Sequence, residues 1–86
     1  MRQWTLAQMQ EGQRGRVLRI GGDGATRQRL LDMGITRGAV IKVERRAPLG
    51  DPIEVTVKGY YLAIRESEAR CVIVDELPAE PGQTGQ

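Results

Sequence analysis

The chain has no histidine and no phenylalanine, and it has a single cysteine, Cys71. One cysteine cannot form an internal disulfide, and one thiol without an imidazole cannot complete the ligand set of a structural zinc site. A chain of 86 residues that lacks both reinforcements depends on the packing of one small apolar core. A lone thiol at the head of an apolar run is typical of a small buried side chain in a reducing compartment, so we expect an intracellular protein.

Long apolar runs are also missing. The apolar runs are only a few residues long, far below the about 20 residues that a helix needs to span a bilayer. The amino terminus, Met1 to Trp4, contains no apolar stretch of signal-peptide length. We therefore expect a cytoplasmic protein that reaches a membrane only through a partner.

The residue patterns of catalysis and of nucleotide binding are missing as well. There is no serine beside a base and no evident pair of carboxylates. The stretch from Gly21 to Gly24 is rich in glycine, but no lysine followed by serine or threonine comes after it. Arg27 stands where a dinucleotide-binding fingerprint requires glycine. We expect no enzymatic activity, no cofactor and no metal site.

Positive charge is concentrated in the first half of the chain. The net charge is +2, but residues 1–46 carry ten basic and four acidic side chains, and residues 47–86 carry three and seven. Most of the basic residues are arginines, which favour planar contacts with carboxylates or phosphates. This pattern fits a solvated surface, a docking face for an acidic protein or a nucleic-acid contact.

One convincing helix and several short strands are expected. Thr5 to Gln8 has the form of a capping box before a helical turn over Leu6 to Met9. A strand over Arg16 to Ile20 is followed by a glycine-rich loop. The helix covers Ala25 to Met33, with Asp23 as its cap and Gly34 as its terminating residue.

The second half alternates with a period of two. From Val40 the pattern places Ile41, Val43 and Arg45 on one side of a strand and Val40, Lys42 and Glu44 on the other. Strands over 53–57 and 60–64 form a hairpin through Lys58-Gly59, a helical turn covers 66–69, and a last strand starts at Cys71. About five short antiparallel strands with one helix predict an all-β fold, a small barrel. We place the domain at residues 1–77 and a disordered tail at residues 78–86, which are polar and rich in proline and glycine.

Three stretches, taken in order, carry the pattern of a known family. The first is Leu6 with the glycine-introduced strand that runs from Gly12 and Gly15 to Ile20. The second is Arg29-Leu30-Leu31-Asp32-Met33-Gly34-Ile35 with Gly38. The third is Gly50-Asp51-Pro52-Ile53 with Gly59, Leu62, Ala63, Ile64, Arg65, Glu68, Ala69 and Val74. Over residues 5 to 76 the chain resembles a stand-alone FeoA domain.

The resemblance implies a barrel of the SH3 type, with a short helix inserted after the first strand. It also implies a role as a small accessory protein of bacterial ferrous iron uptake. FeoA proteins are cytosolic partners of FeoB, a membrane protein whose amino-terminal G domain hydrolyses GTP and whose helices carry Fe(II). We expect the partner to dock on the arginine-rich half and on an exposed loop, at Arg27, Arg29, Arg37, Arg45, Arg46 and Leu49.

Two other functions remain open. Small barrels bind nucleic acids through basic grooves lined with stacking aromatic residues, but the candidates here are Tyr60 and Tyr61, which are adjacent and face opposite ways, and the distant Trp4. The same domain also occurs at the carboxyl end of some metal-dependent repressors, so a stand-alone interaction module related to those domains is the second alternative.

Overall fold

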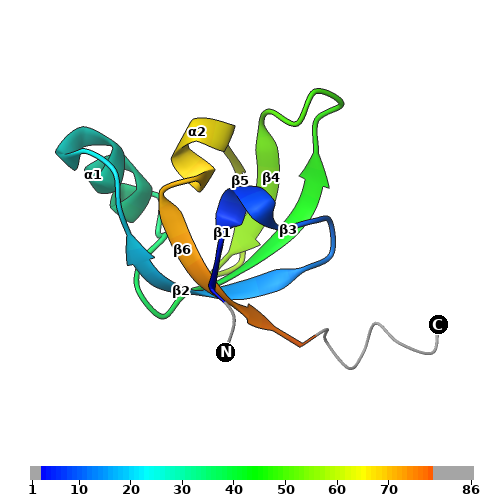
Figure 1. The fold of residues 1–86 in the computed structure, drawn as a ribbon, viewed down its shortest axis with the longest axis horizontal. Coiled ribbons are helices and arrows are strands. Elements are labelled where there is room, and N and C mark those ends of the chain that lie inside the picture. Colours follow the sequence, from blue (N-terminus) through cyan, green and yellow to red (C-terminus); the bar gives the residue numbers. More distant parts are fainter. Residues whose placement is uncertain (1–2, 79–86) are drawn as a thin grey trace.

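A computed structural model describes residues 3–78 and shows one antiparallel sheet that curls around the core (Figure 1). The strands are β1 (Gln3–Thr5), β2 (Arg14–Ile20), β3 (Val40–Arg46), β4 (Ile53–Val57), β5 (Tyr60–Ile64) and β6 (Val72–Leu77). Their order in the sheet is β1-β6-β2-β3-β4-β5. The helices are the 3-10 turn η1 (Leu6–Gln8), α1 (Gly24–Asp32) and α2 (Glu66–Ala69). The expected all-β architecture is confirmed, with six strands instead of about five.

The additional strand is β1, at the amino end of the described chain. It pairs with β6, and Trp4 lies opposite Val74. Three residues are too few for a clear period, which is why the sequence pattern did not indicate a strand there. The expected capping box follows directly, because the Thr5 amide donates to Gln8 Oε1 over 2.8 Å. With β1 counted, α1 follows the second strand and not the first.

The helix α1 begins and ends at the predicted signals. The Thr26 amide donates to Asp23 Oδ1 over 2.7 Å, so Asp23 is the cap. Gly34 has a φ of 94°, a left-handed conformation that glycine adopts without steric cost. The chain then turns back, and the Ile35 amide donates to the Leu30 carbonyl over 3.1 Å. Leu30 and Ile35 are both fully buried, which fixes the end of α1 to the sheet.

The hairpin of β4 and β5 also forms as expected. Lys58 and Gly59 have φ values of 53° and 81°, the geometry of a two-residue turn with both central residues left-handed. The chain continues into α2, which contacts η1, and these two short helices lie together over the open side of the curled sheet (Figure 1).

A small apolar core fills the space inside the curled sheet. Its fully buried side chains include Leu6 from η1, Leu30 from α1 and Ile64 from β5, with Ile41, Val43, Ile53, Val55, Val72 and Val74 from the other strands. Gly15 of β2 is buried, and a Cβ at this position would lie 2.9 Å from Val74 Cβ. The close approach of β2 and β6 therefore requires glycine at this position.

Two β-bulges interrupt the alternation. In β3, Val43 pairs with Val55 and Arg45 pairs with Glu54, so Glu44 is an extra residue. The prediction that Arg45 shares the face of Ile41 and Val43 is therefore wrong: Arg45 is exposed.

In β2, Val17 pairs with Val74 and Arg19 with Ile73, so Leu18 is the extra residue. Strict alternation would point Arg19 inward with Gly15 and Val17, but it is exposed.

The predicted tail at residues 78–86 lies, beyond Pro78, outside the described residues. Within residues 3–78 no helix is long and apolar enough to cross a bilayer.

Candidate functional site

The structure separates the six residues predicted to contact a partner. Arg45 donates to Glu54 Oε1 from its Nη2 over 2.9 Å, and the Tyr61 hydroxyl donates to the same oxygen. The hydrogen bond from Tyr61 and the Arg45 guanidinium lower the pKa of Glu54, and the bond to Glu54 raises the pKa of Tyr61. Arg45 is thus committed to a cross-strand cluster on the surface of β3, β4 and β5.

Arg46, the next residue, has a structural environment. Its Nη2 donates to the carbonyls of Ala7 and Met9, and its Nε donates to the Met9 carbonyl over 3.1 Å. These carbonyls belong to the end of η1 and the residue after it, where the helix leaves acceptors without intrahelical donors. Arg46 therefore fastens η1 to β3 and is only half exposed.

Arg29 and Leu49 lie apart from each other. Arg29 Nε lies 2.8 Å from Glu68 Oε2, so its guanidinium binds α1 to α2. Leu49 lies in the loop between β3 and β4 and is 96% exposed. Neither residue lines the hollows that the remaining two predicted residues share.

Arg27 of α1 and Arg37 of the loop before β3 come together at one groove. It consists of two adjoining hollows of about 190 and 530 Å³ that share Leu18, Arg19 and Arg37. We call it the arginine groove. Four basic and three large aliphatic side chains line it. The basic ones are Arg16, Arg19, Arg27 and Arg37, and the aliphatic ones are Leu18, Ile20 and Leu31. No acidic residue lines either hollow.

The four arginines of this groove have no partner of their own within residues 3–78. They take part in none of the side-chain hydrogen bonds or ion pairs found there, in contrast to Arg29, Arg45 and Arg46. Asp75 lies opposite Arg16 in the register of β2 and β6, but the two form no ion pair. Clustered charges of the same sign repel one another when no counter-charge lies between them. An anionic partner would relieve this repulsion, so the face favours binding of negatively charged groups.

Local geometry explains how the groove is built. The bulge at Leu18 places Arg19 on the outer face of β2. Arg27 and Leu31 are four residues apart on α1, so they share one face of the helix, the face toward β2. Leu30, the residue before Leu31, is fully buried, so α1 presents one leucine to the core and the next one to the groove.

Arg16, Arg19, Leu18 and Leu31 were missed by sequence reasoning. The excess of arginine in the first half of the chain indicated that Arg16 and Arg19 could belong to a basic surface. Nothing in the pattern of apolar and polar residues along β2 indicated a bulge. Leu31 resembled an ordinary core residue at the end of a helix. The groove forms from β2, α1 and the loop at Arg37, and only the tertiary structure brings these three together.

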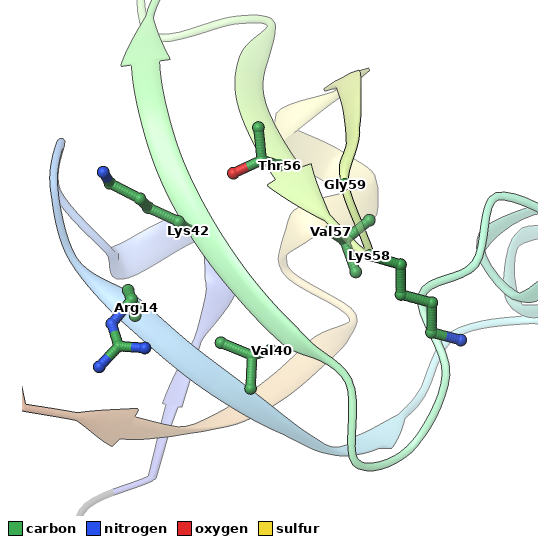
Figure 2. Close-up of a pocket in the computed structure, with 7 residues that line it drawn as sticks. All are labelled: Arg14, Val40, Lys42, Thr56, Val57, Lys58 and Gly59. Carbon is green, nitrogen blue, oxygen red and sulfur yellow. The ribbon is translucent and has the colours of Figure 1, made fainter. Parts of the chain in front are cut away.

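A second basic region lies along the outer face of β2, β3 and β4. It contains a hollow of about 250 Å³ whose lining includes Arg14, Val40, Lys42, Thr56 and Val57. Figure 2 shows these side chains, with Arg14 and Lys42 on the same side. Lys58 points away from the other two cations, and its Nζ donates to Thr36 Oγ1 over 3.0 Å. The cations therefore do not converge on one point in this hollow. It extends the positive surface of the arginine groove, since Arg14 and Arg16 are two residues apart on β2.

Acidic and thiol side chains do not gather into a metal-binding group in the part of the chain that the structure describes. Residues 3–78 contain no group of three or more Asp, Glu or Cys side chains that could hold a metal ion. Cys71 is a free, half-buried thiol that packs against the core beside Gly22.

The family model and a curated relative identify one family. The FeoA domain pattern matches residues 4–76. A curated relative, the Fe(2+) transport protein A/Fe(2+) transporter FeoB fusion protein of Porphyromonas gingivalis, is 31% identical over 70 residues. That alignment covers 81% of this chain and only 8% of the fusion protein.

Solved structures show the same fold. The FeoA-like protein from Clostridium acetobutylicum has a TM-score of 0.85 and 34% identity, and the match covers 93% of each chain. The FeoA of Stenotrophomonas maltophilia, solved in complex with zinc and described as a prokaryotic SH3 domain protein, has a TM-score of 0.73 and 28% identity. The match covers 84% of this chain and 89% of that one. The sheet described above is thus an SH3-like barrel.

Proposed function

Because this chain belongs to the FeoA family of ferrous iron transport, we propose that it is a cytoplasmic accessory protein that binds a FeoB-type GTPase-transporter and adjusts its activity. It performs no catalysis of its own in this proposal. It reaches the membrane only by binding that partner.

The observation that carries the proposal is the fusion protein of P. gingivalis. There a segment 31% identical to this chain is joined to FeoB in one polypeptide. A covalent link holds two domains at a high effective concentration, which is useful when the two act together. A FeoA domain that is not joined to FeoB must achieve the same encounter through its own surface. The charge of this chain supports such an encounter, because electrostatic complementarity raises association rates.

The arrangement of charged groups favours binding over chemistry. The groove offers cations and aliphatic side chains, but no nucleophile beside a base and no carboxylate pair lines it. An arginine donated to the GTP site of a partner stimulates hydrolysis in some GTPases. The groove arginines Arg16, Arg19, Arg27 and Arg37 are exposed, form no ion pair within residues 3–78, and are candidates for this role.

The experiment is a surface-based binding measurement with the cognate full-length FeoB in membrane nanodiscs, with and without a GTP analogue. We expect saturable binding and a change in the GTPase rate of FeoB when this protein is added. A strain that lacks the gene should take up Fe(II) more slowly, and the wild-type gene should restore uptake. The proposal is wrong if the protein does not bind FeoB and the deletion strain takes up iron normally.

A further inference from the structure

The arginine groove combines three features. It is hollowed, its four arginines lack counter-charges in the described chain, and it has an aliphatic floor. The floor side chains Leu18 and Leu31 are half-buried, and neither belongs to the set of residues that pack against the core. Aliphatic side chains left outside the core of so small a domain are available to a partner.

From these features we infer that the arginine groove is a docking site for an acidic amphipathic segment of a protein, in which carboxylates flank one or two large aliphatic side chains. This inference rests on the proposed function, since the segment belongs to the cytosolic part of the FeoB-type partner. The aliphatic side chains of the segment lie on Leu18 and Leu31. Its carboxylates pair with the arginines on both sides of that floor.

The chemistry of the groove favours carboxylates. A guanidinium presents two parallel N–H donors that match a carboxylate, and such paired bonds are stronger than those between neutral groups. Because of the bulge at Leu18, Arg16 and Arg19 lie opposite Asp75 and Ile73, which are two residues apart on β6, so they are about 7 Å apart along the strand. Arg27 and Arg37 face them from α1 and the loop before β3. A segment lying between these two rows can satisfy cations on both of its sides.

Nucleic acid fits the groove less well. Sequence-tolerant binding of single strands needs aromatic side chains on which bases stack. No aromatic residue lines either hollow of the groove. Tyr60 and Tyr61 are on β5, and β3 and β4 separate that strand from β2 in the sheet. A bound nucleic acid would also leave the aliphatic side chains Leu18 and Leu31 without an apolar partner.

The test compares two pairs of matched variants for binding to full-length FeoB in nanodiscs. The first pair is Arg19→Gln with Arg37→Gln against Arg65→Gln with Arg70→Gln, which removes the same charge outside the groove. The second pair is Leu31→Ser against Leu77→Ser, which makes the same change at the half-buried last residue of β6, a leucine that lines neither hollow. Thermal unfolding of each variant verifies that the domain is folded.

We expect the groove arginine variant to bind at least tenfold more weakly, with a slower association rate and a flatter salt dependence. Leu31→Ser should dissociate about tenfold faster, because apolar anchors set the lifetime of a complex. Both controls should bind like the wild type.

Groove variants that are folded and bind FeoB like the wild type would overturn the inference and leave the proposed function standing. If the wild-type protein does not bind FeoB, the inference is overturned, and the proposed function is overturned with it when the deletion strain also takes up iron normally. A third arm adds a single-stranded 12-mer oligonucleotide at 50 and 150 mM salt. Submicromolar binding at the higher salt that depends on Arg19 and Arg37 would show a nucleic-acid site and would also overturn the inference.

Discussion

Arg29 of α1 and Glu68 of α2 form an ion pair in which only one partner is exposed to solvent. The two atoms, Arg29 Nε and Glu68 Oε2, are 2.8 Å apart, and the side chains are 56% and 10% exposed. The second carboxylate oxygen of Glu68 accepts the Arg65 amide over 3.0 Å at the start of α2. One nearly buried carboxylate thus caps α2 and holds α1 beside it.

We predict that Arg29→Ala destabilises the domain more than an ordinary surface substitution. The Glu68 carboxylate would keep its burial and lose its counter-charge, which costs more than the loss of an exposed pair. A double-mutant cycle with Glu68→Gln, followed by urea denaturation, should give a coupling free energy of about 1 kcal/mol. Strictly additive effects would show that the pair contributes nothing. The result also matters for function, since Arg29 would then serve the fold and not the partner.

A second prediction contrasts the neighbours Arg45 and Arg46. Arg46→Ala should lower the free energy of unfolding by about 1–3 kcal/mol, because carbonyls of Ala7 and Met9 lose a donor in a half-buried setting. Arg46→Lys should restore little, since an ammonium cannot reproduce the planar fork that spans both acceptors. Arg45→Ala is the control and should leave the denaturation midpoint nearly unchanged. Equal effects of Arg45→Ala and Arg46→Ala would contradict the assignment.

A third prediction concerns acid. The hydrogen bond from the Thr26 amide lowers the pKa of Asp23 below its ordinary value. A lowered folded-state pKa contributes stability above the unfolded-state pKa of about 3.9, and this contribution is lost as the pH falls through the folded-state value.

Asp23→Asn keeps an oxygen that can accept the Thr26 amide but cannot titrate. Urea denaturation of both proteins from pH 7 to pH 2 should show the wild-type advantage shrinking as the solution becomes acidic. An advantage that stays constant over this range would exclude Asp23 as its source.

A fourth prediction is that the protein binds no Fe(II) or Zn(II) tightly. The chain has no histidine, and residues 3–78 contain no cluster of acidic or thiol ligands that could hold a metal. Anaerobic calorimetry with Fe(II), and separately with Zn(II), should give no stoichiometric site of submicromolar affinity. Such a site that survives Cys71→Ser would refute the prediction. It would also mean that this chain binds metal, as does its zinc-bound relative from S. maltophilia.

Local sequence determined much of the fold. The Asp23 cap, the left-handed Gly34 and the Lys58-Gly59 turn are decided within a few residues of chain, because capping bonds and backbone sterics act over that range. For the same reason the helix and the hairpin were predicted nearly to the residue. The family pattern also identified the domain. Many residues of the pattern lie in turns or in the core, so they are required by the fold itself.

Only the tertiary structure decided where the arginines point. A bulge depends on how two strands pair, so the period of β3 placed Arg45 on the core face, whereas the extra residue Glu44 turned it outward. The same device turned Arg19 outward in β2. Charge and composition alone made the arginines of the first half look alike. In the folded chain Arg46 binds carbonyls of η1, and Arg29 pairs with Glu68. Arg27 and Arg37 instead lie beside Arg19 in the groove, where they meet no acceptor within residues 3–78.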